Sequence, residues 1–217
     1  ASAFRSGFAV IAGRPNVGKS TLLNRMVGQK IAIVSDKAQT TRNRISGVLN
    51  RPGLQVVFID TPGIHKPKHR LGEYMLAVAE NTLNDVDVVL FVVDGSQPPG
   101  PGDRYVASLL DRVSSPVIVA LNKMDLVADS HAPGTAGSGG GRAGQGYLDA
   151  YAALVKAEKV IPVSARTGAN VDSLVEAAGL LMPEGPMYYP EDMVTDQPEQ
   201  LLVRELIREK LLALTRE

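Results

Sequence analysis

The sequence predicts an α/β fold, with a mostly parallel six-stranded sheet, helices on both faces and one antiparallel edge strand. Short apolar runs alternate with amphipathic stretches, which is the pattern of repeated strand–helix units on a parallel sheet. Each run is rich in β-branched residues and bounded by turn-forming residues, as expected of strands covered on both faces. The length of 217 residues and the 44% hydrophobic content suffice for one domain with a sizeable core and a short appendage.

Strand and helix positions follow from this pattern. Buried strands are predicted at residues 8–12, 56–59, 88–93, 117–121 and 160–163, with the antiparallel edge strand at 45–49. Helices are predicted at residues 19–27, 71–84, 103–113, 147–156 and 171–182. Gly28 is expected to end the first helix, because glycine readily adopts the left-handed conformation that stops a helix.

Charge and cysteine content exclude several classes of function. Lysine plus arginine equals aspartate plus glutamate, 23 of each, so no overall basic field attracts nucleic acid or membrane. With no cysteine, the chain has no disulfide, thiolate metal site or cysteine nucleophile. The most apolar run, 86–93, is far too short to span a bilayer. We expect a soluble, cytoplasmic monomer.

Composition divides the chain into three regions. Residues 1–183 are predicted to form the main domain, in which the Gly- and Ala-rich insert 131–146 is expected to be a flexible surface loop without a function of its own. Residues 184–198 are rich in proline and acidic side chains, which indicates an extended linker. Leucines then recur at helical spacing, so 199–217 is predicted to form an amphipathic helix. Its apolar face needs a partner, so this helix either packs on the main domain or begins a second domain.

A phosphate-binding loop follows the first predicted strand. The motif G-x-x-x-x-G-K-[ST] is matched by Gly13-Arg14-Pro15-Asn16-Val17-Gly18-Lys19-Ser20, and Thr21 follows it in the predicted helix. The glycines let backbone N–H groups point at phosphate oxygens, and the helix N-terminus adds positive charge. Lys19 is expected to reach the β- and γ-phosphates and the Ser20 hydroxyl to bind Mg²⁺. The loop makes the predicted fold that of a P-loop NTPase.

Further groups are expected beside the phosphates. Asp60 and Gly63 belong to the sequence Asp-Thr-Pro-Gly, which follows a predicted strand at the sheet edge where ligands gather. Asp60 is expected to hold the Mg²⁺ shell, and the Gly63 N–H to meet the γ-phosphate. In such switches a hydroxyl on a mobile loop completes the Mg²⁺ coordination. Thr40 and Thr41 both qualify chemically for that role.

Base recognition is assigned to the ends of the last two predicted strands. Asn122, Lys123 and Asp125 follow one strand, and Ser164 with Ala165 follows the next. The Asp125 carboxylate can accept both N1–H and the N2 amino group of guanine, whereas adenine would leave it unpaired. Asn122 is expected to tie this loop to the phosphate loop, and the Lys123 stem to lie over the purine. A backbone N–H at Ser164-Ala165 would meet guanine O6, so the predicted ligands are GTP and GDP.

Three functions remain to be weighed against these motifs. The leading hypothesis is a switch that hydrolyses GTP. The second is a GTP-dependent binding module in which hydrolysis is incidental, and stimulation of turnover by a partner distinguishes the two. An ATP-using kinase on the same phosphate loop is disfavoured, because the 122–125 motif would have no role in it.

Longer segments carry a family resemblance. They include GRPNVGKSTLLN, IAIVSDKAQTTRNRISGV, DTPGIHKPKHRLGEYM, VSARTGANVD and PEGPMYYPEDMVTDQPEQ. These segments resemble the bacterial Era GTPases of the TRAFAC class. The resemblance implies a GTPase of small ribosomal subunit assembly that binds the 3′ end of 16S ribosomal RNA through a C-terminal KH domain. Because that domain would follow Glu217, the chain is expected to be truncated before it.

The resemblance also bears on the ions and on the rate of hydrolysis. It selects Thr41 as the Mg²⁺ ligand and implies K⁺ at Asn16. Ile64 stands where Ras-like enzymes carry the glutamine that orients the attacking water, so hydrolysis is expected to be slow. We hypothesise that backbone groups and the two ions replace that glutamine. The cationic loop 65–70 is either a solvated segment or a contact with RNA or with phosphates on the inner face of the cell membrane.

Overall fold

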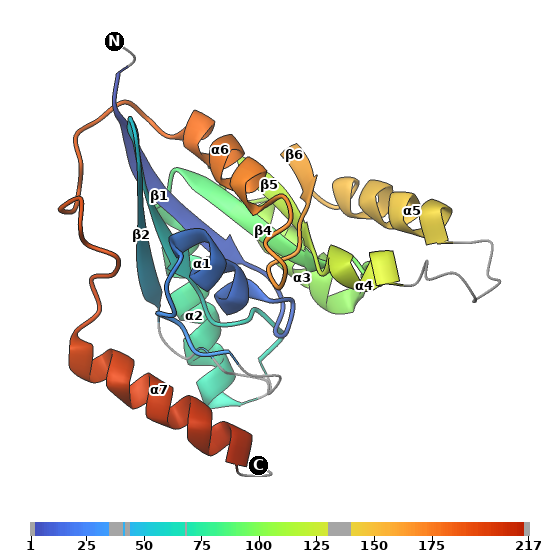
Figure 1. Ribbon diagram of the computed structural model, residues 1–217. Coiled ribbons are helices and arrows are strands. Elements are labelled where there is room, and N and C mark those ends of the chain that lie inside the picture. The colour runs from blue at the N-terminus through green and yellow to red at the C-terminus, as the bar shows by residue number, and fades with distance from the viewer. Residues whose placement is uncertain (1–2, 35–40, 42–43, 68, 130–139, 215–217) are drawn as a thin grey trace.

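The computed structural model in Figure 1 describes residues 3–34, 41, 44–67, 69–129 and 140–214. Within these residues the strands form one six-stranded sheet in the order β2-β3-β1-β4-β5-β6. The strands are β1 (Arg5–Ala12), β2 (Ile45–Arg51), β3 (Leu54–Asp60), β4 (Val88–Asp94), β5 (Val117–Asn122) and β6 (Ala157–Pro162). All neighbours pair in parallel except β2 and β3, which confirms the predicted mostly parallel sheet with an antiparallel edge.

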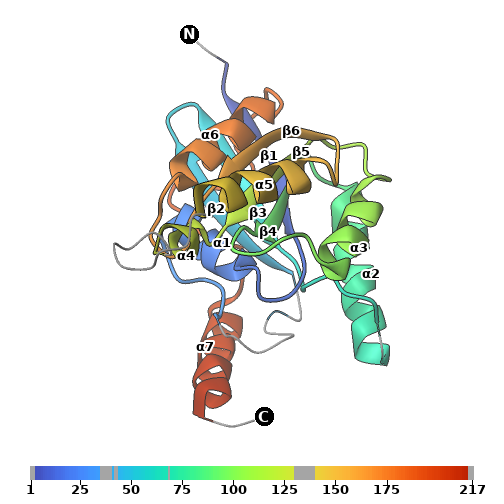
Figure 2. The same cartoon turned by 90° about the vertical axis from the view of Figure 1, so that its right-hand side faces the viewer.

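Helices cover both faces of the sheet, as predicted (Figure 1, Figure 2). One face carries α1 (Lys19–Val27) and α6 (Val171–Leu181). The other carries α2 (Arg70–Asn84), α3 (Pro101–Leu110) and α5 (Gly140–Ala152). The short helix α4 (Met124–Asp129) follows β5, and α7 (Glu199–Leu214) lies below the sheet in Figure 1.

Alternate residues of each central strand fill two separate cores. In β4, Leu90 and Val92 belong to the core under α1 and α6. Phe91 and Val93 belong to the core under α2, α3 and α5. Successive side chains of a strand point to opposite faces, so a strand covered on both sides must be apolar throughout. All residues of 88–93 are 0% exposed, which explains why this run is continuously hydrophobic.

The glycine-rich insert is partly helical, so the prediction of a loop is wrong over residues 140–146. α5 spans Gly140–Ala152, whereas the sequence predicts a helix over 147–156; residues 131–139 of the insert lie outside the described residues. Tyr151 is 0% exposed in the core, and its hydroxyl donates to the carbonyl of Asp94 at 3.2 Å. Packing of this helix outweighs the poor helix propensity of its glycines.

The start of α3 also differs from the prediction of 103–113. The helix begins at Pro101. The N–H of the first residue of a helix has no intrahelical partner, so proline, which lacks an N–H, fits at this position. The Asp103 carboxylate accepts the N–H of Gly100 at 2.9 Å and caps this end. Asp103, which the sequence predicts as the first residue of the helix, therefore lies inside its first turn and caps a start two residues earlier.

The segment predicted to be a linker, residues 184–198, lies along the edge of the sheet formed by β2 (Figure 1). The N–H of Val48 in β2 donates to the carbonyl of Val194 at 2.7 Å. The side-chain carbonyl of Gln55, which is 0% exposed, accepts the N–H of Tyr188 at 2.7 Å. The first bond occupies a backbone N–H that an uncovered edge strand would present to solvent, and the second satisfies a buried side chain of β3.

Glu209 connects α7 to the segment between α1 and β2. Its carboxylate accepts hydrogen bonds from Nζ of Lys30 at 2.5 Å and from the N–H of Val34 at 2.9 Å. Burial opposes ionisation, but these two bonds outweigh it and hold the pKa of Glu209 below its ordinary value. No helix in the described part of the chain has the length and hydropathy to cross a membrane.

Candidate functional site

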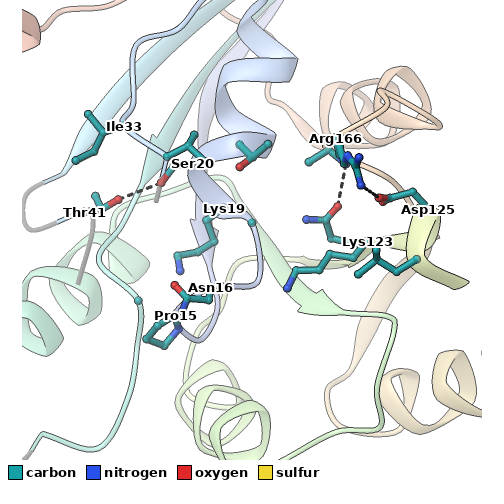
Figure 3. Close-up of a pocket in the computed structure, with 16 residues that line it drawn as sticks. Pro15, Asn16, Lys19, Ser20, Ile33, Thr41, Lys123, Asp125 and Arg166 are labelled. Carbon is teal, nitrogen blue, oxygen red and sulfur yellow. Dashed lines mark hydrogen bonds and ion pairs between the residues drawn. The ribbon is translucent and has the colours of Figure 1, made fainter. Parts of the chain in front are cut away.

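A cavity of about 400 Å³ lies at the sheet edge where the parallel strands end (Figure 3). Loops after β1, β3, β5 and β6 contribute to its walls, together with the connection between α1 and β2. Ligands of open α/β sheets bind at this carboxyl edge. The lining residues are Pro15, Asn16, Gly18, Lys19, Ser20, Thr21, Ile33, Val34, Thr41, Gly63, Asn122, Lys123, Asp125, Leu126, Ala165 and Arg166.

The loop between β1 and α1 curls tightly at two left-handed residues. Asn16 has φ 64° and Gly18 has φ 97°. A Cβ at Gly18 would lie 2.4 Å from Nδ2 of Asn122, so a side chain does not fit there. The first turn of α1, which begins at Lys19, lines the cavity beside this loop. Its free backbone N–H groups and its positive end suit an anion such as phosphate.

Lys19 adds a buried positive charge at the same end of the cavity. The residue is only 7% exposed, and its Nζ donates to the carbonyl of Arg14 at 3.0 Å. Burial lowers the pKa of Lys19 to about 8; the nearby charge of Asp60 acts against this shift, and that of Arg14 adds to it. A phosphate beside Nζ would favour the charged amine, so the residue is suited to bind one.

Three oxygen-bearing side chains meet next to Lys19. The Ser20 hydroxyl donates to Oδ2 of Asp60 at 2.6 Å, and Thr41 Oγ1 lies 3.0 Å from the Ser20 hydroxyl and 3.3 Å from the same carboxylate oxygen. Figure 3 shows the Ser20 and Thr41 side chains pointing toward each other at one end of the cavity. Asp60 is 0% exposed, and its Oδ1 has no hydrogen-bond partner among the described residues.

This donor set fits a magnesium ion. Burial raises the pKa of Asp60, although Lys19 and the hydroxyls of Ser20 and Thr41 favour its charged form. A carboxylate and two hydroxyls are hard oxygen ligands of the kind that Mg²⁺ prefers. A dication held by them would compensate a buried carboxylate that has no partner at one oxygen within the described part of the chain.

The loop after β3 closes this end of the cavity with backbone. A Cβ on Gly63 would lie 2.8 Å from N and Cα of Pro15, so the two loops touch only because Gly63 has none. The N–H of Ile64 donates to the carbonyl of Gly13 at 3.0 Å. The Ile64 side chain is 1% exposed and belongs to the core under α2, α3 and α5. Position 64 therefore presents no polar side chain to the cavity.

Asn122 joins the opposite end of the cavity to the phosphate loop. Its Nδ2 donates to the carbonyl of Val17 at 2.8 Å, and its Oδ1 accepts the N–H of Ala165 at 2.9 Å. One buried carboxamide thus connects the loops after β1, β5 and β6. Both of its polar atoms are paired within the protein, which fixes the relative position of the three loops.

Asp125 presents a fixed acceptor at this end. Its Oδ1 accepts the hydroxyl of Ser164 at 2.7 Å, and its Oδ2 lies 3.7 Å from Nη1 of Arg166 (Figure 3). Ser164 is 1% exposed, whereas the Arg166 side chain is 77% exposed. The exposed arginine can move aside at little cost. The carboxylate can then accept a pair of donors from a ligand.

Twelve of the residues that the sequence predicts for the site line the cavity: Pro15, Asn16, Gly18, Lys19, Ser20, Thr21, Thr41, Gly63, Asn122, Lys123, Asp125 and Ala165. Gly13, Arg14, Val17, Asp60 and Ser164 lie behind the lining and hold it through the bonds described above. The sequence does not predict Ile33, Val34, Leu126 or Arg166. Leu126 and Arg166 directly follow motif residues, so their place in the cavity wall could have been predicted from the sequence. Ile33 and Val34 lie in an apolar run that contains no binding motif, so the sequence offers no sign of their role.

Proteins that are similar to this chain include GTPases of known structure. A family described as 50S ribosome-binding GTPase matches residues 8–123. Era in complex with MgGDPNP and nucleotides 1506–1542 of 16S ribosomal RNA is 40% identical, with a TM-score of 0.87 over 99% of this chain and 69% of that chain. A variant of Aquifex aeolicus Era bound to GDP and AlF4⁻ is 39% identical, with a TM-score of 0.88 and the same coverage. The FeoB G-domain from Methanococcus jannaschii shares the fold at 22% identity, with a TM-score of 0.57 over 82% of this chain and 98% of that chain.

Proposed function

The chain belongs to the Era family of GTPases, and from this premise we propose that its cavity binds GTP and GDP with Mg²⁺ and operates as a hydrolytic switch. One observation carries the proposal. Groups suited to phosphate, to a divalent cation and to the guanine edge lie along a single cavity of about 400 Å³. That volume is within the ordinary range of small-molecule sites.

The phosphate end binds the triphosphate. Backbone N–H groups of the 13–20 loop and the Lys19 amine hold the β- and γ-phosphates, and the Gly63 N–H meets the γ-phosphate. Ser20, Thr41 and Asp60 hold Mg²⁺, which when bound neutralises charge on the phosphate oxygens. Thr41 lies in the connection between α1 and β2, where the sequence analysis expects the mobile hydroxyl, so its contact is the one that depends on the γ-phosphate.

The base end selects guanine. Asp125 accepts N1–H and the N2 amino group. The N–H groups of Ser164 and Ala165, which the sequence assigns to guanine O6, already donate to the carbonyl of Ala169 at 3.0 Å and to Oδ1 of Asn122 at 2.9 Å, so Asp125 carries the selection of guanine. An adenine base would leave the carboxylate without donors, which disfavours adenine nucleotides strongly. Calorimetry with GDP and ADP in the presence of magnesium tests this assignment, because equal affinities would overturn the proposal as a whole.

Hydrolysis proceeds without a side chain that orients water from position 64. The intrinsic rate is then on the order of 10⁻³ s⁻¹ or lower, as in unassisted small GTPases. We propose that K⁺ at Asn16 contributes charge next to the phosphates, because this residue lines the cavity within the same loop as Lys19 (Figure 3). Turnover measured in KCl and in NaCl at equal ionic strength tests the K⁺ contribution, and equal rates would remove it.

The biological role is proposed for the whole protein. A similar structure is Era in complex with nucleotides of 16S ribosomal RNA, which supports a role in small ribosomal subunit assembly. Binding of that RNA through a C-terminal KH domain is the further part of the proposal. Single-turnover GTP hydrolysis with and without small subunits tests this role. Stimulation by the subunits supports the switch, whereas stimulation by anionic vesicles alone would indicate a membrane partner instead.

A further inference from the structure

Asp94 lies between the two loops that form the nucleotide site. It is the last residue of β4, is 3% exposed and does not line the cavity. β4 pairs with β1, which leads into the phosphate loop, and with β5, which leads into the base-recognition loop. A carboxylate at the end of this central strand can therefore contact both loops from behind.

The contacts of Asp94 reach both of these loops. Oδ2 accepts Nζ of Lys123 at 2.8 Å and Nε2 of Gln97 at 2.9 Å, and Oδ1 accepts the hydroxyl of Ser96 at 2.6 Å. Nη2 of Arg14 lies 3.9 Å from Oδ2. Burial opposes ionisation, but the bonds from Lys123, Ser96 and Gln97 outweigh it and keep the pKa of Asp94 below its ordinary value. The group is a carboxylate at neutral pH.

Lys123 depends on this carboxylate for its position. Its backbone is left-handed, with φ 66°, which is unfavourable for a residue with a Cβ unless its surroundings hold it. The side chain is 31% exposed and lines the cavity, while its charged end is tied to Asp94 behind the wall. The methylene stem is thereby the part of Lys123 that a base can contact, as the extended side chain in Figure 3 illustrates.

Arg14 has a second and closer ion-pair partner, so the support of the phosphate loop can be tested separately from the support of Lys123. Its Nε donates to Oδ1 of Asp103 at 3.0 Å, and Asp103 is 0% exposed at the start of α3. The phosphate loop therefore keeps its main support when Asp94 is neutralised. Lys123, in contrast, has Asp94 as its ion-pair partner at 2.8 Å.

We propose that Asp94 is a positioning residue of the nucleotide site, which holds Lys123 so that the lysine stem covers one face of the bound base. The inference rests on the proposed function of the cavity as a guanine-nucleotide site. A stem packed on the ring face contacts any purine, whereas Asp125 reads the guanine edge. Asp94 should therefore act on how long a nucleotide stays bound, and not on the choice of base or on the chemical step.

The first test compares Asp94→Asn with the wild type, using fluorescent GDP in stopped-flow dissociation experiments. We expect dissociation to be faster by about tenfold or more, since a buried charged hydrogen bond is lost. Hydrolysis at saturating GTP should stay within about twofold, and the ratio of GDP to inosine diphosphate affinity should not change. Asp111→Asn, at an exposed carboxylate after α3, is the matched control and should behave as the wild type.

A double-mutant cycle separates positioning from general loosening of the fold. Lys123→Met keeps most of the stem but removes its charged end, so it should speed GDP dissociation by a similar factor of about ten. In the Lys123→Met background, Asp94→Asn should cause no further loss. Asp103→Asn acts on Arg14 instead, and its effect should multiply with that of Lys123→Met.

The outcomes distinguish the inference from its premise. If the wild type shows no preference for guanine nucleotides, the proposed function fails. If the wild type binds GDP selectively but the Asp94→Asn and Lys123→Met effects multiply, Asp94 does not act through Lys123 and the inference is overturned. Unchanged GDP dissociation in Asp94→Asn would overturn it equally.

Discussion

The two ends of the cavity differ in how the protein satisfies their buried polar groups. At the base end, Asn122 and Ser164 are 2% and 1% exposed, and their side chains are paired with Val17, Ala165 and Asp125. At the phosphate end, Asp60 is 0% exposed with one oxygen unpartnered among the described residues, and the pKa of Lys19 is lowered to about 8 by burial. The base end is completed by the protein, and the phosphate end by its ligands.

This difference indicates what each end contributes. Satisfied buried hydrogen bonds stabilise a fold, so the base end supports the unliganded structure. Buried charges without full compensation oppose folding until a ligand supplies opposite charge. Substitutions at the base end should therefore weaken both the fold and base recognition, whereas substitutions at the phosphate end should abolish function at little or no cost in stability.

The largest effect is expected from Asp125→Asn. The amide cannot accept two donors from guanine, so GTP affinity should fall by a factor on the order of 10⁴, and xanthosine triphosphate should become the preferred ligand. Equilibrium binding of GTP and of xanthosine triphosphate measures this change in nucleotide preference. Asp111→Asn is the control, and unchanged GTP affinity in Asp125→Asn would show that the base is bound elsewhere.

Lys19→Met tests the phosphate end. Loss of the amine should lower the rate of GTP hydrolysis by about 100-fold or more, because it removes a charge that stabilises the phosphates in the transition state. Urea unfolding without nucleotide should show a free energy of unfolding equal to or above that of the wild type, since a buried amine with a lowered pKa has been removed. Lys156→Met, at an exposed lysine, is the matched control. A clear loss of stability in Lys19→Met alone would contradict the comparison.

Removal of magnesium should weaken binding at the phosphate end of the cavity and leave binding at the base end unchanged. Chelation is expected to weaken GDP binding by about tenfold or more, because the phosphates then lie next to the uncompensated Asp60 carboxylate. Guanosine has no phosphates and engages only the base end, so its binding should not change. The affinities of GDP and of guanosine are both measured by NMR titration, from the amide chemical shifts of Asp125 and Ala165. An equal loss for guanosine would mean that the two ends are not independent.

The smallest effect is expected from Ser164→Ala. The hydroxyl donates to Asp125 and also accepts the N–H of Thr167 at 3.1 Å. Its loss should lower the free energy of unfolding by about 1–2 kcal/mol and weaken GDP binding only a few-fold. Urea unfolding measures the first quantity, with the exposed Ser173→Ala as control. A variant as stable as the wild type would show that the base end does not support the fold.

Strand periodicity and motif order predicted much of this fold, because both are local properties of the sequence. The continuous apolar run of β4 follows from its burial on both faces. α1 spans the residues predicted for it, since Gly28 ends it in a left-handed conformation with φ 77°. α5 was not predictable over residues 140–146, because its helix is stabilised by distant packing around Tyr151 that outweighs local glycine content.

The features of the candidate site also divide into those that the sequence predicts and those that depend on the folded structure. The sequence by itself determined which residue types follow each strand, and hence the P-loop, the Asp60 and Gly63 loop, and the Asn122–Asp125 motif. Only the tertiary structure decided which of these groups are satisfied by the protein. The partners of Asp94, Lys123 and Arg14 are far apart in the chain, at separations that no local pattern encodes. Burial and pairing depend on what the folded chain places opposite each group, so the different characters of the two ends emerge only on folding.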